Sequence, residues 1–313
     1  MAIQHINLSL TNRCTANCVF CPVHRGERNQ MDMSLELVHK ILDEISSPTF
    51  PWRIGRISVG ENGDAPLHKN FIDILRLIRQ KMPSAKIYLA TNFSQMKPEL
   101  SKTLLDEGLL DVISVNIDGH DAASYTAQKK LKYDLVIKNL KSFVEQRKVS
   151  NQPVKMTVNY LTLREYHDGV MRVIGTMPKK LPAGSEIPYS NEEMIRESLS
   201  WLPEDIILDH PACFYWAERE SLSLGYIDSE NQVRLDCPNI TRVIAEAWIA
   251  PNGDWYACCL DDNQELVWGN VMENTLVEIH NGPHRAEFLD DLVNRRWKKI
   301  GYPCSTVLCC YSA

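Results

Sequence analysis

The alternation of strand-like and helical segments constrains the fold of this chain more than any other feature. Runs rich in Ile, Val, Leu and Tyr have the length of β-strands, and helical spacing of apolar residues lies between them. The strand-like runs are 6–10, 56–59, 86–91, 112–117 and 155–161, and the helical segments are 35–45, 71–80, 99–107, 133–146 and 166–175. Such repeats predict βαβ units in a parallel sheet. Because ligands of these sheets bind at the carboxyl ends of the strands, the residues that follow each strand are the candidates for function.

Length and charge exclude several classes of protein. The 313 residues suit one large domain, or one domain with a small appendage. No apolar run is long enough to span a bilayer, and the first ten residues lack the pattern of a secretory signal, so we expect a cytoplasmic protein with no membrane segment. The net charge of −6 and the lack of a basic block argue against a nucleic-acid partner.

The ten cysteines fall into two groups. Three lie near the start, one is isolated, and six lie towards the end: Cys14, Cys18 and Cys21; Cys213; then Cys237, Cys258, Cys259, Cys304, Cys309 and Cys310. A secreted disulfide scaffold is short and rich in loops, which this chain is not. In a reducing compartment such clustering indicates a metal site.

The early cysteines form a C-x3-C-x2-C run directly after the first predicted strand. Soft thiolate ligands select zinc or iron–sulfur clusters. A four-iron cluster usually takes four cysteines, so three would leave one iron without a protein ligand. An open coordination position is typical of a catalytic metal site. Two other interpretations remain open, namely a structural zinc with His24 as fourth ligand and a set of packed thiols.

This run, with the aromatic Phe20 before its third cysteine, resembles the signature of the radical S-adenosylmethionine (radical SAM) superfamily. Segments after the next three strands are similar to other motifs of that family: Gly63-Asp64 to its "GEP" segment, Thr91-Asn92 to "TNG", and Ser114 to Asp118 to "SIDG". Asp and Ala replace the usual Glu and Pro of the first segment, so its grip on a methionyl amino group could be shifted or shared with Glu61. Phe93 stands where the second segment has Gly.

The resemblance implies an α/β fold with a partial (β/α)6 TIM-like barrel. It also implies a [4Fe–4S] cluster held by Cys14, Cys18 and Cys21, with S-adenosylmethionine at the open iron. Residues that contact S-adenosylmethionine would be Phe20, Gly63, Asp64, Thr91, Asn92, Ser114 and Asp118. An external one-electron donor of flavodoxin or ferredoxin type would reduce the cluster, and the resulting 5′-deoxyadenosyl radical would take a hydrogen atom from the substrate.

The chain changes character from Cys237 onwards. Residues 247–258 have a hairpin pattern with an Asn-Gly turn, Gly269-Asn270 follows, and residues 276–293 predict a helix interrupted near 281–283. This region resembles the small SPASM/twitch domain that holds auxiliary clusters in the same superfamily. Six cysteines favour the twitch form with one extra [4Fe–4S] cluster, whose ligands would be Cys237, Cys258, Cys304 and Cys309, with Cys310 as the alternative fourth. A disulfide or zinc interpretation remains open.

The expected organisation is a radical SAM barrel over 1–190, a connector over 191–235 that walls the active site, and an auxiliary cluster domain over 236–313. Two cysteines lie outside the proposed ligand sets. Cys259 is the first candidate for a hydrogen-atom donor and Cys213 the second, although a free cysteine more often packs as a small apolar residue.

Three functions are compatible with the sequence. The first is oxidation of a small molecule, as in twitch-bearing aminocyclitol dehydrogenases. The second is epimerisation or modification of a sugar or peptide with a cysteine as hydrogen donor. The third is a zinc- or cluster-binding regulatory protein without catalysis. The early first strand leaves no room for a leader-peptide-binding domain, which favours a sugar or aminocyclitol, or a peptide delivered by a separate protein.

Overall fold

The computed structural model describes residues 2–18, 21, 23, 29–151, 154–160, 190–209, 237, 240–261 and 263–305. Several predicted features lie outside these residues. They are the helix over 166–175 and the candidate residues Phe20, His24, Cys213, Cys309 and Cys310.

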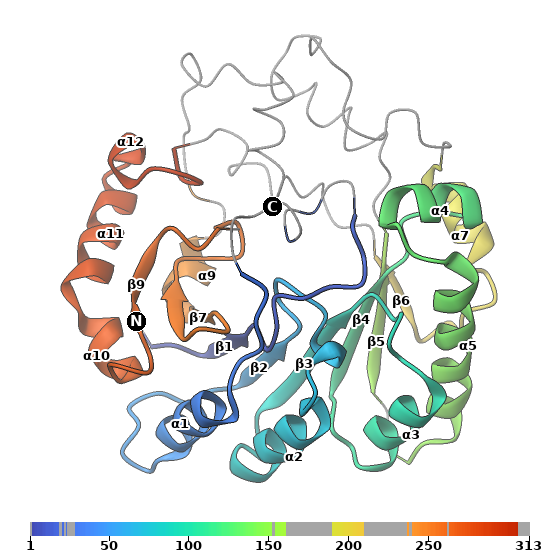
Figure 1. Ribbon diagram of the computed structural model, residues 1–313, viewed down its shortest axis with the longest axis horizontal. Helices are drawn as coiled ribbons and strands as arrows, with labels where there is room; N and C mark the ends of the chain where they lie inside the picture. Colours follow the sequence, from blue (N-terminus) through green and yellow to red (C-terminus); the bar gives the residue numbers. More distant parts are fainter. Residues whose placement is uncertain are drawn as a thin grey trace, which may run out of the picture.

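Six parallel strands form the centre of the molecule (Figure 1). They are β1 (His5–Leu8), β2 (Arg56–Val59), β3 (Lys86–Thr91), β4 (Val112–Asn116), β5 (Lys155–Asn159) and β6 (Ile207–Asp209). Each strand pairs in parallel with the next along the chain. This arrangement confirms the predicted partial barrel. The sequence did not predict β6, since a three-residue edge strand carries too little periodicity to be recognised.

Helices cover one side of this sheet (Figure 1). They are α1 (Leu35–Ser46), α2 (Phe71–Lys81), α3 (Pro98–Asp106), α4 (Ala122–Lys129), α5 (Tyr133–Val149) and α7 (Glu192–Ser198). A short 3-10 turn, η2 (Ala65–Leu67), precedes α2. Helix α4 was not predicted from the sequence, although a capping box between Asp121 and Ser124 marks its start. Both α7 and β6 lie in the segment expected to be a connector, so the sheet continues past residue 190.

The two faces of the sheet differ in polarity because side chains alternate along each strand. Apolar residues such as Ile57 and Val59 are fully buried. The positions between them are polar, and they bond to one another across strands: His5 Nε2 lies 2.7 Å from Ser58 Oγ, and Asn159 Nδ2 donates to Ser114 Oγ at 2.8 Å. We call the face that carries His5, Asn7, Ser58, Tyr88, Ser114 and Asn159 the inner face.

The C-terminal hairpin extends the barrel sheet. After α9 (Ile240–Ala245), β7 (Glu246–Ile249) pairs in parallel with β1. The antiparallel strands β8 (Asp254–Tyr256) and β9 (Val267–Asn270) complete a nine-stranded sheet. The turn includes Gly253 at φ +93°, a conformation that favours glycine. Helices α10 (Leu276–Asn281), α11 (Pro283–Val293) and α12 (Trp297–Ile300) follow, and the predicted interruption falls at Gly282.

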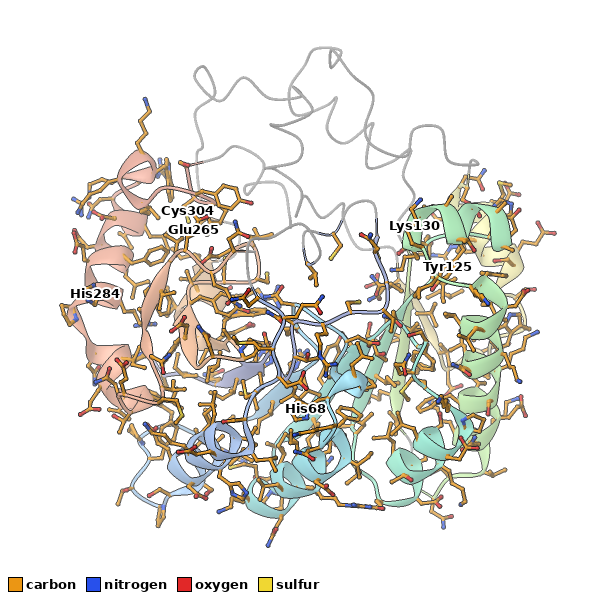
Figure 2. The ribbon with its side chains drawn as sticks, viewed as in Figure 1. His68, Tyr125, Lys130, Glu265, His284 and Cys304 are labelled. Atoms are coloured by element: carbon orange, nitrogen blue, oxygen red, sulfur yellow. The ribbon has the colours of Figure 1, made fainter. Side chains whose placement is uncertain are left out.

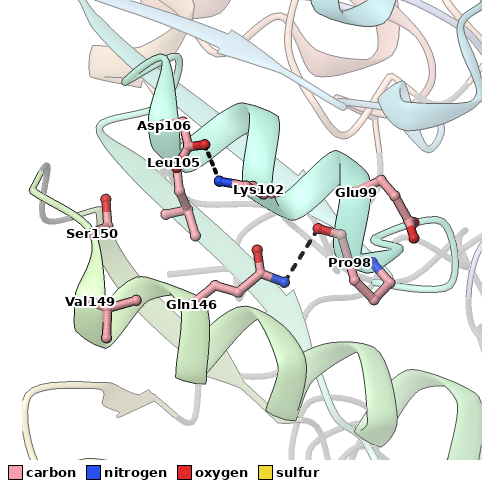
Figure 3. A pocket seen from close by; sticks show the side chains of 8 residues that line it. All are labelled: Pro98, Glu99, Lys102, Leu105, Asp106, Gln146, Val149 and Ser150. Carbon is pink, nitrogen blue, oxygen red and sulfur yellow. Dashed lines mark hydrogen bonds and ion pairs between the residues drawn. The ribbon is translucent and has the colours of Figure 1, made fainter.

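Two further observations concern the outside of the molecule. An open groove of about 400 Å³ lies between α3 and α5, where Gln146 Nε2 donates to the Pro98 carbonyl at 3.3 Å (Figure 3). Because both helices belong to the layer that covers the sheet, this groove is separate from the inner face. Among the described residues, no helix combines the length and apolar character needed to cross a membrane.

Candidate active site

The three early cysteines lie in the loop that follows β1. The Cys21 amide donates to the Cys18 carbonyl at 3.1 Å, which curls this part of the loop. Burial raises the pKa of Cys14 to about 11 and that of Cys21 to about 12, and the charges of Cys18 and Cys14 add to the shift at Cys21. The three sulfurs therefore lie close enough to interact electrostatically.

The loop after β2 packs directly against the cysteine loop. A Cβ on Gly63 would lie 2.0 Å from the Thr11 carbonyl oxygen, so only glycine fits this contact. The next amide, of Asp64, donates to the Arg13 carbonyl at 2.8 Å. Arg13 is itself fixed by an ion pair with Asp32 at 2.7 Å. These contacts hold Asp64 in a defined position beside the start of the cysteine run.

Asp64 is a buried carboxylate with one oxygen available. Its side chain accepts a hydrogen bond from Thr91 Oγ1 at 2.6 Å through Oδ1, and Oδ2 has no partner among the described residues. Burial raises the pKa of Asp64. An unpartnered buried carboxylate oxygen is costly unless a cation reaches it, so this site suits the ammonium group of an amino-acid ligand.

The segment after β3 connects the same two loops. Asn92 Nδ2 donates to Thr15 Oγ1 at 3.1 Å and lies 3.5 Å from Cys14 Sγ. Phe93, which replaces a glycine of the family motif, adopts φ +63°, a conformation that glycine favours. Its ring packs edge-on against Phe143, with centroids 5.5 Å apart. The backbone of the motif is therefore kept although the residue differs.

Lys129 is a residue of this region that the sequence analysis missed. Although Lys129 has basic neighbours in the sequence, it is only 4% exposed and forms an ion pair of 2.7 Å with Asp118. Burial by itself lowers the pKa of Lys129, but Asp118 raises it above the ordinary value. Burial raises the pKa of Cys18, and the charge of Lys129 opposes that shift. The Asn17 amide also donates to the Lys129 carbonyl at 3.1 Å, which joins α4 to the cysteine loop.

The sequence carries one signal for the burial of Lys129, namely its helical spacing from Tyr125. Tyr125 precedes it by four residues on the same helix face and is fully buried. Figure 2 shows Tyr125 and Lys130 at α4, with Cys304 in the C-terminal part of the chain across the view. The hydroxyl of Ser114 accepts a hydrogen bond from Asn159 on the inner face, whereas Asp118 forms its ion pair with Lys129. The segment similar to "SIDG" therefore contacts both the inner face and Lys129 of α4.

The structure describes four of the late cysteines. Cys258, Cys259 and Cys304 are buried and Cys237 is partly buried, and no disulfide joins two of the seven described cysteines. The disulfide alternative thus has no pair within the described part of the chain. Asp261 closes the loop after β8, since its carboxylate accepts from the Glu265 and Leu266 amides at 2.9 Å each.

Cys259 lies among charged side chains. Arg242 Nη1 is 3.9 Å from its sulfur, and Arg242 Nε lies 3.3 Å from Glu246 Oε1. Burial raises the pKa of Cys259 to about 12, although Arg242 opposes the shift. Glu61 interacts electrostatically with Arg242, Arg56 and Glu246, and burial raises its pKa. Glu61 therefore belongs with this group of charges, whereas Asp64 is bonded to Thr91.

The donor atoms suit an iron–sulfur cluster, because cysteine thiolates are the usual ligands of such clusters. No three His, Cys, Asp or Glu side chains within the described ranges converge at the distances that one metal ion requires. The cysteines of a four-iron cluster each bind a different iron, so their sulfurs need not converge. Together with the available oxygen of Asp64, the three thiols suit a cluster that has an amino-acid ligand at its side.

The structure combines a partial parallel barrel with a three-cysteine loop at the carboxyl end of β1, and a second cysteine-bearing unit is joined to this barrel. Such a combination is typical of an iron–sulfur barrel protein. Comparison with known families agrees. The model of the radical SAM superfamily matches residues 8–171, which is more than half of the chain, and that of an iron–sulfur cluster-binding domain (SPASM) matches residues 237–311. The chain belongs to the radical SAM superfamily. It is a radical SAM enzyme with a SPASM domain, and it binds [4Fe–4S] clusters and S-adenosylmethionine.

Individual relatives are distant. The chain is 27% identical over 138 residues to a "tungsten-containing aldehyde ferredoxin oxidoreductase cofactor-modifying protein" of Pyrococcus furiosus; the match covers 41% of this chain and 37% of that protein. The fold of this chain is similar to that of BtrN, with a TM-score of 0.58 and 15% sequence identity; the match covers 99% of this chain and 92% of BtrN. The fold is also similar to that of SuiB from Streptococcus suis, with a TM-score of 0.58 and 14% sequence identity; the match covers 91% of this chain and 67% of SuiB.

Proposed function

We propose that this radical SAM enzyme dehydrogenates a small hydroxylated molecule, such as a sugar or an aminocyclitol. The alcohol would lose a hydrogen atom from carbon, a proton and one further electron. It would thus lose two hydrogens in all and become a ketone. The observation that carries the proposal is the polar inner face. The cysteine loop follows the carboxyl end of β1, whereas β8 runs antiparallel to β7 and leads Cys258 and Cys259 back towards the level of Glu246. A substrate on the inner face would thus lie between two groups of cysteines.

The proposed roles of the residues at the first group follow from their contacts. Cys14, Cys18 and Cys21 would hold a [4Fe–4S] cluster, which when bound supplies the electron for cleavage of S-adenosylmethionine to a 5′-deoxyadenosyl radical. Asp64 would bind the methionyl ammonium through its available oxygen. Thr91 and Asn92 would orient Asp64 and the cysteine loop. For Phe20, Gly63, Ser114 and Asp118, contact with S-adenosylmethionine remains part of the proposal.

The proposed ligands of one auxiliary [4Fe–4S] cluster are Cys237, Cys258, Cys304 and Cys309, with Cys310 as the alternative. When bound, this cluster would accept the second electron from the substrate. The domain boundary at residue 236 is likewise proposed, and the pairing of β7 with β1 supports a close relation of the two units. A flavodoxin- or ferredoxin-type protein is proposed as the external electron donor.

Isotope transfer tests the proposal. Candidate sugars and cyclitols deuterated at single carbons are incubated with the reconstituted enzyme, S-adenosylmethionine and a reductant. We expect deuterium in 5′-deoxyadenosine, a product two hydrogens lighter than the substrate, and one S-adenosylmethionine consumed for each oxidation. Product of unchanged mass would exclude dehydrogenation, whatever the isotope result.

One observation favours a second candidate, epimerisation with Cys259 as the hydrogen donor. Cys259 lies beside Arg242, which also contacts Glu246 at the edge of the inner face. The variant Cys259→Ala separates the two reactions. A dehydrogenase keeps forming ketone, whereas an epimerase without its donor still forms 5′-deoxyadenosine but no inverted product. Cys213 is the alternative donor. SuiB, whose fold is similar, has been solved bound to the precursor peptide SuiA, so this second candidate function includes a peptide as substrate.

A further inference from the structure

We propose that Asn7, Ser9 and Trp248 form a hydroxyl-binding row on the inner face, which takes an uncharged polyhydroxylated small molecule. The inference deepens the proposed function and rests on it, because it names the groups that would hold the substrate and the chemistry that they recognise.

The three side chains have unused hydrogen-bonding atoms. All three residues are at most 1% exposed. Among the described residues, Asn7 Oδ1, Ser9 Oγ and Trp248 Nε1 have no hydrogen-bond partner. Most buried polar atoms in folded proteins do have a partner, so three such atoms together indicate a ligand or ordered water that is to be bound there.

The three side chains also share one face of adjacent strands. Asn7 and Trp248 are directly paired in the register of β1 with β7. Ser9 follows Asn7 by two residues and continues the ladder, since its amide donates to the Ile249 carbonyl at 3.0 Å. The Asn7 amide nitrogen donates to Glu246 Oε2 at 3.0 Å, which leaves Oδ1 as its free acceptor.

The charged groups beside the row already have partners of opposite charge. Glu246 lies 3.3 Å from both His5 Nδ1 and Arg242 Nε, so its carboxylate already has cationic and hydrogen-bonding partners. Glu61 has Arg242 and Arg56 as electrostatic neighbours. The carboxylates beside the row are thus balanced by guanidinium groups, and the atoms left over are neutral. The hydroxyl groups of a polyol can donate to Asn7 Oδ1, accept from Trp248 Nε1, and either donate to or accept from Ser9 Oγ, whereas a carboxylate only accepts and an ammonium group only donates.

An unpartnered indole alone would not define a site. Trp255 and Trp268 also lack a partner for Nε1 among the described residues. All three indoles have ring contacts: Trp255 with Trp268 (centroids 5.8 Å apart), Trp268 with Phe288, and Trp248 with Tyr256 (centroids 6.3 Å apart). What distinguishes Trp248 is the presence of two free acceptors in the same row. Trp255 therefore offers a matched control.

Binding is measured anaerobically by calorimetry on the reconstituted holoenzyme with S-adenosylmethionine and without reductant. The probes are myo-inositol, D-glucose, D-glucuronate and tetra-alanine. We expect saturable binding of at least one of the two neutral polyols and weaker binding of glucuronate and of the peptide. Ser9→Ala and Trp248→Phe each remove one neutral hydrogen bond and should raise the dissociation constant about 3- to 10-fold. Trp255→Phe should leave it within about twofold, an ordinary effect for a residue that does not touch the ligand.

The proposal is overturned if neither polyol binds up to its solubility limit, if the peptide or glucuronate binds more tightly, or if Ser9→Ala and Trp248→Phe bind the polyol as the wild type does. Thermal unfolding of each variant identifies loss of binding that results from misfolding. Because no turnover takes place in this experiment, polyol binding can be found even if the isotope experiment excludes dehydrogenation, so the two failures are distinguishable.

Discussion

The substitution Asp64→Asn separates ligand binding from folding at the candidate active site. Asn has nearly the same shape and can still accept the hydrogen bond that Thr91 donates at 2.6 Å. It removes the negative charge of the oxygen that has no partner within the described chain. A hydrogen bond between charged groups contributes about 1.5–3 kcal/mol. Its loss should weaken the binding of S-adenosylmethionine by about 10- to 150-fold.

Stability should change little in the same variant. The Asp64 carboxylate is buried and its pKa is raised by burial, so replacing it with a neutral amide removes a desolvation cost. We expect the free energy of unfolding to stay within about 1 kcal/mol of the wild type. Binding is measured by equilibrium dialysis of labelled S-adenosylmethionine with the reconstituted protein, and Asp134→Asn, an exposed change of the same kind on α5, is the control. Wild-type affinity in Asp64→Asn would refute the assigned role of this carboxylate.

Three further predictions concern stability. Lys129→Met leaves Asp118 buried without its 2.7 Å partner and should cost about 3–5 kcal/mol, measured by thermal unfolding of the apoprotein; a loss below about 1 kcal/mol would contradict this. Gly63→Ala should displace the loop after β2, because the added Cβ would lie 2.0 Å from the Thr11 carbonyl oxygen. Both the melting temperature and the affinity for S-adenosylmethionine should therefore fall. An unchanged melting temperature would show that the loop adapts and would contradict this prediction. Folding raises the pKa of Asp64, so the contribution of this carboxyl group to stability is complete below its ordinary pKa of 3.8 and is lost as the pH rises through the folded-state pKa. Unfolding of the apoprotein at a series of pH values should show this loss of stability in the wild type and not in Asp64→Asn.

The barrel could be predicted because its strands and helices have clear periods. The strands over 56–59 and 86–91 were predicted with the bounds that the structure has. Their inner-face residues could not be recognised as a site, because a polar residue within a short strand is equally compatible with exposure to solvent. His5 and Asn7 become meaningful only when β7 brings Glu246 beside them.

Lys129 shows a second limit of the sequence. A lysine among basic neighbours is usually solvated, and only the tertiary position of α4 places its ammonium against Asp118. Likewise, the hairpin of the C-terminal unit followed from Asn252-Gly253, but its attachment to β1 did not. Pairing between strands that are more than 200 residues apart depends on which edge of the sheet is left free, and local sequence does not contain that information.

The central claim is that Cys14, Cys18 and Cys21 hold a [4Fe–4S] cluster that cleaves S-adenosylmethionine. The most direct measurement compares iron content and 5′-deoxyadenosine formation in the wild type and in a variant with all three cysteines changed to Ala. After anaerobic reconstitution we expect about eight irons per chain in the wild type and about four in the variant, with 5′-deoxyadenosine formed only by the wild type. A variant that keeps the wild-type iron content, or that still forms 5′-deoxyadenosine, would contradict the account.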